Sequence, residues 1–494
     1  MFLLSCLPIL LPVLAGAFLF LWKPESRRAR EYYVMAAALL TTALIFAAIT
    51  VTFTQGSDVT ACTLVRFSSG MTLSLRIDRA SMIFGMIIAV LWPITTAYAF
   101  EYMKHEGKEN KFFGFFLMSY GVVCGIAFAE DFLTLYIFYE MLTLSTLPLV
   151  MHSLDQKARY AGRKYFIYSF SGAAAVFILL IFLMQYGTTL NFTYGGVLNM
   201  KKIASEEAIL RAVFVLSFFG FGVKAAVFPV HSWLPDASVA PTPVTALLHA
   251  VAVVKSGVFA IMRLIYFGFG TDFLYGTTAQ AVVMAAAIIT IVFGSARAVR
   301  AQHFKRRLAY STISNLSYIV LGFTLMTPTG LTAGLVHMVF HAVLKITLFF
   351  CAGAVMYKTG REYVYEMSGL ARKMPIVFAT YTVSALGLLG LPPLGGFVGK
   401  WNIATASVAL GTPMGYAGAA ALIVSAVLTV LYLIPVTVDS IWSRDTLVYN
   451  EAHAPREPNA YMCVPLLLLT VGGVVLAFAS QPLMALLSGV AAGM

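Results

Sequence analysis

The stretch FGVKAAVFP, residues 221–229, is apolar except for Lys224 and runs into a series of prolines. A second stretch, GLPPLGGFVGK at residues 390–400, repeats this combination of a proline break and a lysine, here Lys400. The interrupting prolines are Pro229, Pro235, Pro241, Pro243, Pro392 and Pro393. Inside a membrane, freed backbone groups and a charge are tolerated only where they line protein or water. Paired broken segments in two halves of a membrane protein are typical of a transport path, so the two stretches predict ion transport.

The composition is that of a membrane protein. Sixty per cent of the 494 residues are hydrophobic and 11% are charged, whereas about 25% of a soluble domain is charged. The net charge of +12 does not indicate nucleic-acid binding, because the basic residues lie in short loops between apolar runs. Five scattered cysteines without a Cys-x-x-Cys pair predict neither a disulfide framework nor an iron–sulfur cluster. We therefore expect no cofactor, no metal and no redox chemistry in this chain.

Apolar runs of about 20 residues fit the thickness of the hydrocarbon core, and fourteen such runs predict an all-α polytopic membrane protein. They lie near 2–22, 31–53, 78–100, 112–129, 132–152, 163–186, 208–229, 241–266, 279–296, 308–325, 330–356, 374–407, 415–438 and 460–487. The first run lacks a basic segment before it and further runs follow, so we interpret it as a retained span rather than a signal peptide.

The basic residues set the predicted orientation, because cytoplasmic loops carry an excess of Lys and Arg. Of the 33 Lys and Arg residues, 22 lie in odd-numbered loops, seven in even-numbered loops or their margins, and four within spans. This distribution places both termini outside the cytoplasm, in a multi-pass protein of the cytoplasmic membrane. The polar segment 54–77 is predicted to form an external hairpin.

Glu140 and Lys224 are predicted to lie within the membrane. Glu140 follows Asp131 by nine residues, which is roughly 13 Å along a helix and close to the middle of a bilayer. A lysine at this depth costs about 2.5–3.5 kcal/mol on insertion scales. Lys224 is therefore the natural partner of Glu140, since each charge offsets part of the burial cost of the other. A purely structural clamp, or a lysine that reaches up to the lipid headgroups, is the alternative.

The run at 330–356 carries His337, His341 and Lys345, which fall within about 80° of one another on a helix and form one stripe. Imidazoles exchange protons near neutral pH, so the stripe suits a proton relay; a structural hydrogen bond between helices is the alternative. The run at 241–266 carries His249 and Lys255, about 120° apart on a continuous helix. We expect His249 to face the break near His231 and Asp236, and Lys255 to receive a proton from Lys224.

The sequences FPVHSWLPDA at 228–237 and APTPVTALLH at 240–249 closely resemble the signature of the antiporter-like membrane subunits. These subunits occur in respiratory complex I, in Mrp-type cation/proton antiporters and in membrane-bound hydrogenases. The resemblance covers nearly the whole chain, including Glu140 and Lys345. It implies fourteen helices with two inverted five-helix repeats, each with one broken helix, and a path through Glu140, Lys224, Lys255, His341 and Lys400. The corresponding divisions of the chain are 1–111 with the external hairpin, 112–266, 267–438 and 439–494.

Within this family the chain is most similar to the D subunit of Mrp antiporters, because Lys400 stands where some complex I counterparts carry glutamate. Its expected partners are protons, other membrane subunits of one complex and the lipid bilayer. A proton-pumping subunit of an NADH-quinone oxidoreductase or a hydrogenase is the first alternative, and any redox chemistry would then belong to other subunits. A stand-alone solute transporter and a scaffolding subunit without flux are alternatives of other classes. The sequence leaves open whether Na⁺ is transported.

Overall fold

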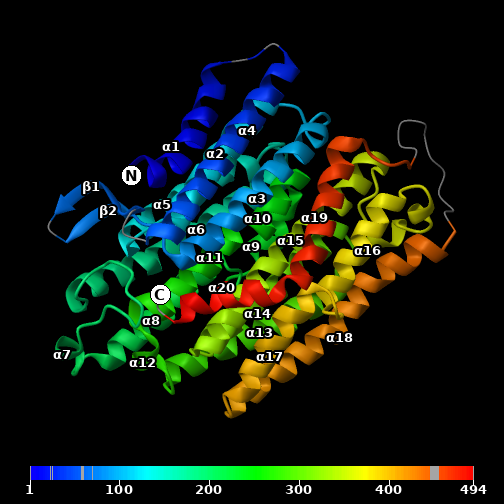
Figure 1. The fold of residues 1–494 in the computed structure, drawn as a ribbon. Coiled ribbons are helices and arrows are strands. Elements are labelled where there is room, and N and C mark those ends of the chain that lie inside the picture. Colours follow the sequence, from blue (N-terminus) through cyan, green and yellow to red (C-terminus); the bar gives the residue numbers. More distant parts are fainter. Residues whose placement is uncertain are drawn as a thin grey trace.

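The structure is a computed structural model that describes residues 2–22, 24, 26–56, 60–68, 70–444 and 455–492. Long helices lie side by side and form most of the molecule (Figure 1). They are α1 (Phe2–Leu21), α2 (Arg27–Gln55), α3 (Arg79–Tyr102), α4 (Glu109–Ala127), α5 (Phe132–Val150), α6 (Gln156–Tyr186), α8 (Glu207–Gly222), α11 (Val253–Arg263), α13 (Thr278–Arg300), α14 (Phe304–Thr324), α15 (Pro328–Thr359), α16 (Pro375–Leu389), α17 (Gly395–Ala409), α18 (Pro413–Trp442), α19 (Ala460–Phe478) and α20 (Ser480–Ala491). The short helices are α7 (Met200–Ile203), α9 (Trp233–Asp236), α10 (Thr242–Ala250) and α12 (Thr271–Leu274).

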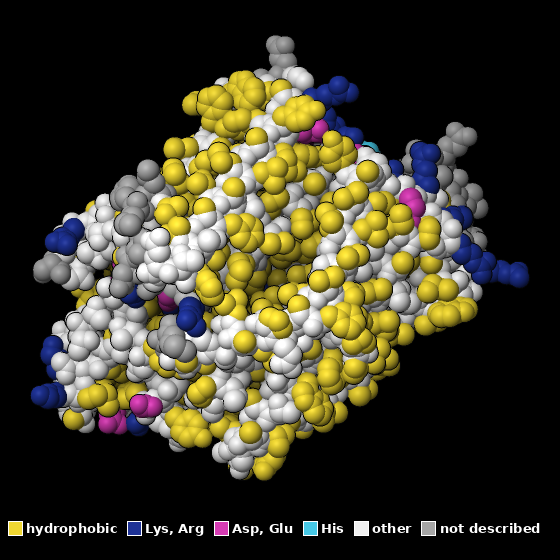
Figure 2. Space-filling model, viewed as in Figure 1, with side chains coloured by type: hydrophobic (Ala, Val, Ile, Leu, Met, Phe, Trp, Pro, Cys, Tyr) yellow, Lys and Arg dark blue, Asp and Glu magenta, His cyan; other side chains and the backbone are white. Residues whose placement is uncertain are grey.

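The prediction of an all-α polytopic membrane protein is confirmed. Within the described residues, eleven helical segments are long and apolar enough to cross a membrane. Apolar side chains cover much of the face in Figure 2, and most Lys and Arg side chains lie at the two ends of the helices. The three other predicted spans correspond to the shorter or more polar helices α8, α14 and α16–α17. The count of fourteen spans, the inverted repeats and the orientation stay predictions.

Two spans that the sequence predicted as continuous are divided. The span at 241–266 breaks at Val251, where the N–H groups of Val251 and Ala252 both donate to the Leu247 carbonyl, at 2.9 and 2.8 Å. The last span breaks at Ala479, and α20 turns away from the direction of α19 (Figure 1). Pro482 lies in the first turn of α20, a position that favours proline, and is the overlooked signal for this second break.

Two strands, β1 (Cys62–Ser68) and β2 (Met71–Leu75), form an antiparallel hairpin between α2 and α3 in which Cys62 pairs with Leu75. The hairpin is tied to the bundle, since the Ser74 N–H donates to the Thr134 hydroxyl at 2.9 Å. The structure thus has a hairpin within 54–77. Its position outside the membrane stays a prediction, as do the divisions 1–111, 112–266, 267–438 and 439–494, of which the last includes residues 445–454, beyond the described part.

The centre of the molecule is formed by α10, α11 and α15: every residue of α10 and α11 is buried, and so are most residues of α15. Arg263, the last residue of α11, is fully buried and forms two hydrogen bonds with Asp78, at 2.6 and 2.7 Å. Asp78 also caps the N-terminus of α3 by accepting from the Ser81 N–H, so one carboxylate fixes the start of α3 against the end of α11. The central position of α11 and α15 brings the titratable side chains of both halves together.

Candidate functional site

The first break begins where α8 ends at Gly222, and the protein itself satisfies the freed backbone groups. The Val227 N–H donates to the Gly222 carbonyl at 2.9 Å. The indole N–H of Trp233 donates to the Val223 carbonyl at 2.7 Å. Proline at 229, 235, 241 and 243 prevents a regular helix from continuing through this segment. The unwound chain is thus lined by protein, as its expected depth in the membrane requires.

Lys224 projects from this break and is fully buried. Its ammonium donates to the backbone carbonyl of Tyr139 on α5, and Nζ lies 3.5 Å from the centroid of the Tyr139 ring. Glu140 is the next residue, and its carboxylate and Lys224 act on each other electrostatically. Among the described residues no ion pair joins the two, and the buried Oε1 of Glu140 has no hydrogen-bond partner. The structure therefore brings the predicted pair close together without direct contact.

Gly257 of α11 packs directly on the first break. A Cβ atom at this position would lie 2.7 Å from the Lys224 carbonyl carbon and closer still to the Ala225 nitrogen. Only glycine allows two backbones to approach this closely. Lys255 lies two residues before Gly257, so the contact sets the distance between Lys224 and Lys255.

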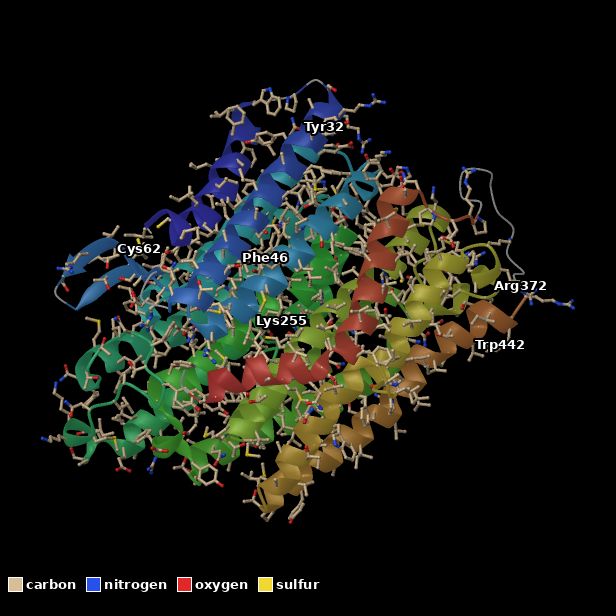
Figure 3. The ribbon with its side chains drawn as sticks, viewed as in Figure 1. Tyr32, Phe46, Cys62, Lys255, Arg372 and Trp442 are labelled. Carbon is tan, nitrogen blue, oxygen red and sulfur yellow. The ribbon has the colours of Figure 1, made fainter. Side chains whose placement is uncertain are left out.

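Lys255 links α11 to α15. Its side chain is fully buried, and Nζ lies 2.5 Å from Nδ1 of His341. Figure 3 shows Lys255 near the middle of the helices, far from either charged end. Because Lys255 belongs to the first predicted repeat and His341 to the second, this hydrogen bond is a direct connection between the two.

His337, His341 and Lys345 form one buried stripe along α15. The ring centroids of the two histidines are 6.1 Å apart. Lys345 donates to the Ser311 hydroxyl of α14 at 2.7 Å, and Ser311 shares a hydrogen bond of 2.8 Å with the Tyr432 hydroxyl of α18. The stripe is thus continuous with hydroxyl groups on two neighbouring helices.

Lys400 lies beside the second break, between α16 and α17, and is 9% exposed. It donates at 3.1 Å to the carbonyl of Leu389, the last residue of α16, where the helix dipole favours a cation. Its Nζ lies 5.1 Å from the centroid of the Tyr318 ring, which is 5.4 Å from the His337 ring. A Cβ atom at Gly399 would lie 2.6 Å from Nδ1 of His337, so α17 and α15 touch at this point.

The expected environment of His249 is wrong. The helix is divided between His249 and Lys255, and the His249 ring packs on Phe349 of α15 with the centroids 4.9 Å apart. The charges that act on His249 are Lys345 and Lys305, so it faces the second half of the chain. His231 and Asp236 lie elsewhere: the His231 ring contacts Phe228 and Phe293, and Asp236 forms ion pairs with Lys164 and Arg306.

Several buried atoms of these side chains have no hydrogen-bond partner among the described residues. They are Oε1 of Glu140, both ring nitrogens of His249 and of His337, and Nε2 of His341. Buried polar atoms are nearly always hydrogen-bonded to protein or to ordered water. Other buried atoms elsewhere in the described residues share this property, but here they belong to imidazole and carboxyl groups, which can exchange protons.

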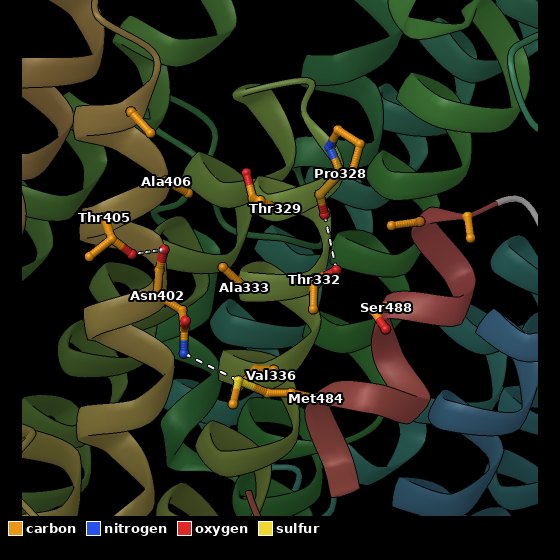
Figure 4. Close-up of a pocket in the computed structure, with 13 residues that line it drawn as sticks. Pro328, Thr329, Thr332, Ala333, Val336, Asn402, Thr405, Ala406, Met484 and Ser488 are labelled. Atoms are coloured by element: carbon orange, nitrogen blue, oxygen red, sulfur yellow. Dashed lines mark hydrogen bonds between the residues drawn. The ribbon is translucent and has the colours of Figure 1, made fainter. Parts of the chain in front are cut away.

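A cavity of about 530 Å³ lies between α15, α17 and α20 (Figure 4). Its polar lining includes Thr329, Thr332, Asn402, Thr405 and Ser488. Asn402 lies two residues after Lys400 and approaches the sulfur of Met484 on α20 at 3.6 Å. The cavity therefore begins close to the end of the row.

Sequence reasoning missed the hydroxyl groups of Ser311, Tyr318, Ser425 and Tyr432. Ser425 hydrogen-bonds Tyr318, and also Ser295 and Ser314 at 2.5 and 3.1 Å. The residue types alone could not reveal this cluster, because most Ser and Thr side chains in helices bond to their own backbone. The only available signal was the unusual number of hydroxyls in 308–325.

Comparison with known proteins identifies the family of the chain. Residues 129–429 match the family described as NADH:quinone oxidoreductase/Mrp antiporter, TM. The chain belongs to this family. It is 31% identical over 482 residues to NADH-quinone oxidoreductase subunit N of Desulforudis audaxviator, covering 90% of this chain and 93% of that one.

Two further similarities are to a cation/proton antiporter and to a Mrp complex. The chain is 29% identical over 417 residues to the A-type component of the Na⁺/H⁺ antiporter of Alkalihalophilus pseudofirmus, covering 81% of this chain and half of that longer protein. In fold it is similar to the solved structure of the Mrp complex from Dietzia sp. DQ12-45-1b, with a TM-score of 0.84, 23% identity and coverage of 100% of this chain and 97% of that one. The chain is therefore an antiporter-like, proton-translocating type of membrane subunit.

Proposed function

We propose that this chain conducts protons as a D-like subunit of a Mrp-type Na⁺/H⁺ antiporter. The observation that carries the proposal is the row of buried titratable side chains from Lys224 to Lys400. The Lys255–His341 hydrogen bond of 2.5 Å connects the two halves of this row. Burying each lysine is costly, so a row of four is retained for function rather than for stability.

In this mechanism Lys224 alternates between two environments. When it is charged, its position beside Glu140 is favourable because opposite charges attract. When Glu140 moves away or is neutralised, the buried ammonium loses that support and releases its proton towards Lys255. His341 and His337 then carry the proton along α15. His249 and Lys345 lie beside this route and exchange protons with it. Lys400 is the last proton-holding group.

The cavity beside Asn402 is the proposed exit. Its wall includes Asn402, two residues after Lys400 on α17, and Lys400 is the least buried lysine of the row, at 9% exposure. The threonine and asparagine side chains of the cavity supply hydrogen-bonding groups for water. In the predicted orientation α17 ends on the outer side, so the cavity leads away from the cytoplasm. The second break would act as the hinge that opens or closes this route.

Two lateral features support a place within a larger complex. Leu391, Pro392 and Pro393 of the second break are exposed on the isolated chain, although unwound backbone at membrane depth requires protein or water around it. Glu140 is also only partly buried. A neighbouring subunit that covers these positions would complete the environment of both ends of the row. The cytoplasmic membrane, with both termini outside, is the proposed location.

A complex I-like pump subunit is the second candidate. It is favoured by the relative named subunit N, of which the chain covers 93%. A stand-alone solute transporter is disfavoured, because the buried lysines and histidines form a connected row of titratable groups and do not line the cavity. Purification of the tagged chain from its native membrane discriminates these candidates. Small antiporter subunits in equal amounts support the Mrp assignment, whereas flavin- or iron–sulfur-containing subunits contradict it.

Replacement of Glu140 or Lys224 by alanine tests the conduction mechanism. We expect both variants to lose proton flux in vesicles containing the whole complex, because the alternation of Lys224 between its two environments is then impossible. Assembly should persist, as judged by co-purification of the other subunits. The matched control is Lys202→Ala, an exposed lysine in α7. Wild-type flux in Lys224→Ala vesicles would contradict the mechanism, and Na⁺ counterflux in the same vesicles determines whether sodium is exchanged.

A further inference from the structure

Two cysteines that are far apart in the sequence meet where the hairpin joins α1. The Sγ atoms of Cys6 and Cys62 are 3.6 Å apart. The side chains are buried, at 2% and 8% exposure. Figure 3 shows Cys62 at the base of the hairpin, beside the N-terminal end of α1. This meeting is not evident from the sequence, in which the five cysteines have no regular spacing.

The surrounding hydrogen bonds hold the two cysteines in place. The Ser5 hydroxyl, next to Cys6, donates to the Thr60 carbonyl at 2.5 Å, and the Ile77 N–H donates to the Thr60 hydroxyl at 3.1 Å. Thr60 thus connects α1, the start of the hairpin and the approach to α3. Because Ser5 is next to Cys6 and Thr60 lies two residues before Cys62, these hydrogen bonds hold the two cysteines near each other in the fold.

We propose that Cys6 and Cys62 form a disulfide bond in the native membrane. A disulfide has an S–S distance of about 2.05 Å, so the sulfur atoms must approach by a small movement of two side chains. The predicted orientation puts this end of α1 and the hairpin outside the cytoplasm, where disulfides form and persist. The neighbouring Ala61 and Thr63 are exposed, so the strand that carries Cys62 lies at the surface of the folded chain. The inference rests on this orientation and not on the proposed function.

The proposed oxidant is a molecule of the extracytoplasmic space that carries a reactive disulfide. The thiolate of one cysteine attacks the oxidant disulfide, forms a mixed disulfide and releases one oxidant thiolate. The thiolate of the second cysteine then attacks the protein sulfur of the mixed disulfide and releases the other oxidant thiolate. Two electrons pass to the oxidant, which becomes a dithiol, and the two thiol protons pass to water or to the released thiolates.

The bond would link the hairpin covalently to α1. It would also restrict the conformations of the unfolded chain, because it closes a loop between residues 6 and 62. Cross-links of this kind stabilise the folded state mainly by this restriction. The other three cysteines serve as internal controls, because they are buried without another thiol in hydrogen-bonding contact among the described residues: Cys124, Cys351 and Cys463.

Thiol trapping tests the proposal directly. Cells that express the whole complex are quenched in acid, free thiols are alkylated in denaturant, and the chain is digested without reduction for mass spectrometry. We expect a peptide pair linked through Cys6 and Cys62, while Cys124, Cys351 and Cys463 carry the alkyl label. Recovery of Cys6 and Cys62 in alkylated form overturns the proposal.

The melting temperature of the purified complex gives a second, independent result. If the bond exists, Cys6→Ser, Cys62→Ser and the double variant all lower it by the same amount, because each removes the same cross-link. Reduction of the wild type should produce the same shift, and proton flux should stay at the wild-type level. Different single-variant shifts that add in the double variant overturn the proposal.

Discussion

Lys400 differs from the other buried lysines in its surroundings. It donates to the carbonyl that ends α16 and is 9% exposed, whereas Lys224, Lys255 and Lys345 are fully buried. The role proposed for it needs a group that gains and loses a proton. A permanent cation would not cycle, and a neutral side chain would not hold the proton at all.

Substitution of Lys400 therefore distinguishes a proton carrier from a structural cation. We expect Lys400→Arg to be inactive, because a guanidinium with a pKa above about 12 stays charged, and Lys400→Ala to be inactive for lack of a titratable group. Lys400→Glu should retain partial activity, since a carboxylate can exchange protons. Proton flux in vesicles across several pH values measures all three. Wild-type flux in the Arg or Ala variant places Lys400 outside the path.

At the residue scale the sequence indicated the charged and imidazole groups and little else. A lysine or glutamate in an apolar run is conspicuous because its burial is costly, so Glu140, Lys224 and Lys345 stood out. Ser311 accepts the Lys345 hydrogen bond but did not stand out, because a hydroxyl in a helix usually bonds to the backbone of its own helix. The neighbouring Thr312 does so, donating to the Leu308 carbonyl. Only the packing of α14 against α15 and α18 separates the two cases.

The helix breaks are the elements on which conduction depends, and a labelling experiment tests whether they are hydrated. Cysteines at Val230 and Leu394, beside the two breaks, should react with a small polar thiol reagent in the assembled complex. A cysteine at Leu14, 64% exposed on α1, should react only with a membrane-soluble reagent. The labelling of each variant is measured as the excess over the labelling of the parent protein. Inertness of both break positions to the polar reagent would indicate dry, purely structural kinks.

The contact between α11 and the first break predicts a strong effect of a single methyl group. Gly257→Ala should destabilise the protein by about 1–3 kcal/mol, the usual cost of overpacking, and should lower proton flux by separating Lys224 from Lys255. Gly472→Ala is the matched control, because a Cβ atom there meets nothing within 4 Å and alanine favours a helix. Thermal unfolding and flux are measured together. Equal behaviour of the two variants would contradict the proposed role of this contact.

At the element scale, clustered prolines predicted the breaks at 229–243 and 392–393, because each proline removes a backbone donor that a helix interior needs. A single proline is a weaker signal, since Pro93 and Pro148 lie inside the continuous helices α3 and α5. The break at Val251–Ala252 has no proline or glycine within four residues on either side. It arises from packing, since α10 and α11 lie in the fully buried centre and are oriented by their neighbours rather than by local preference. Nothing in the sequence indicates this break, so His249 and Lys255 were predicted to lie on one continuous helix. The predicted environment of His249 was therefore wrong.

At the scale of the whole molecule, the central claim is that protons pass between the two halves of the chain along the membrane plane. Neither half contains a complete row: Lys224 and Lys255 come from the first, and His341, His337 and Lys400 from the second. The family resemblance implied all of these members except His337, which the stripe along 330–356 suggested. Only the fold shows that Lys255 and His341 are in hydrogen-bonding contact and that the Tyr318 ring lies near both His337 and Lys400.

Proton flux in vesicles that contain the whole complex, with the Lys255–His341 contact removed, tests this claim most directly. Lys255→Ala and His341→Ala should each lower flux by about 100-fold or more, the usual loss when a positioned proton-transfer group is removed. His105→Ala is the control, because His105 is exposed and lies outside the row, and it should transport like the wild type. Assembly of each variant is checked by co-purification. Wild-type flux in assembled Lys255→Ala and His341→Ala complexes would contradict the account, since protons would then cross without passing between the two halves.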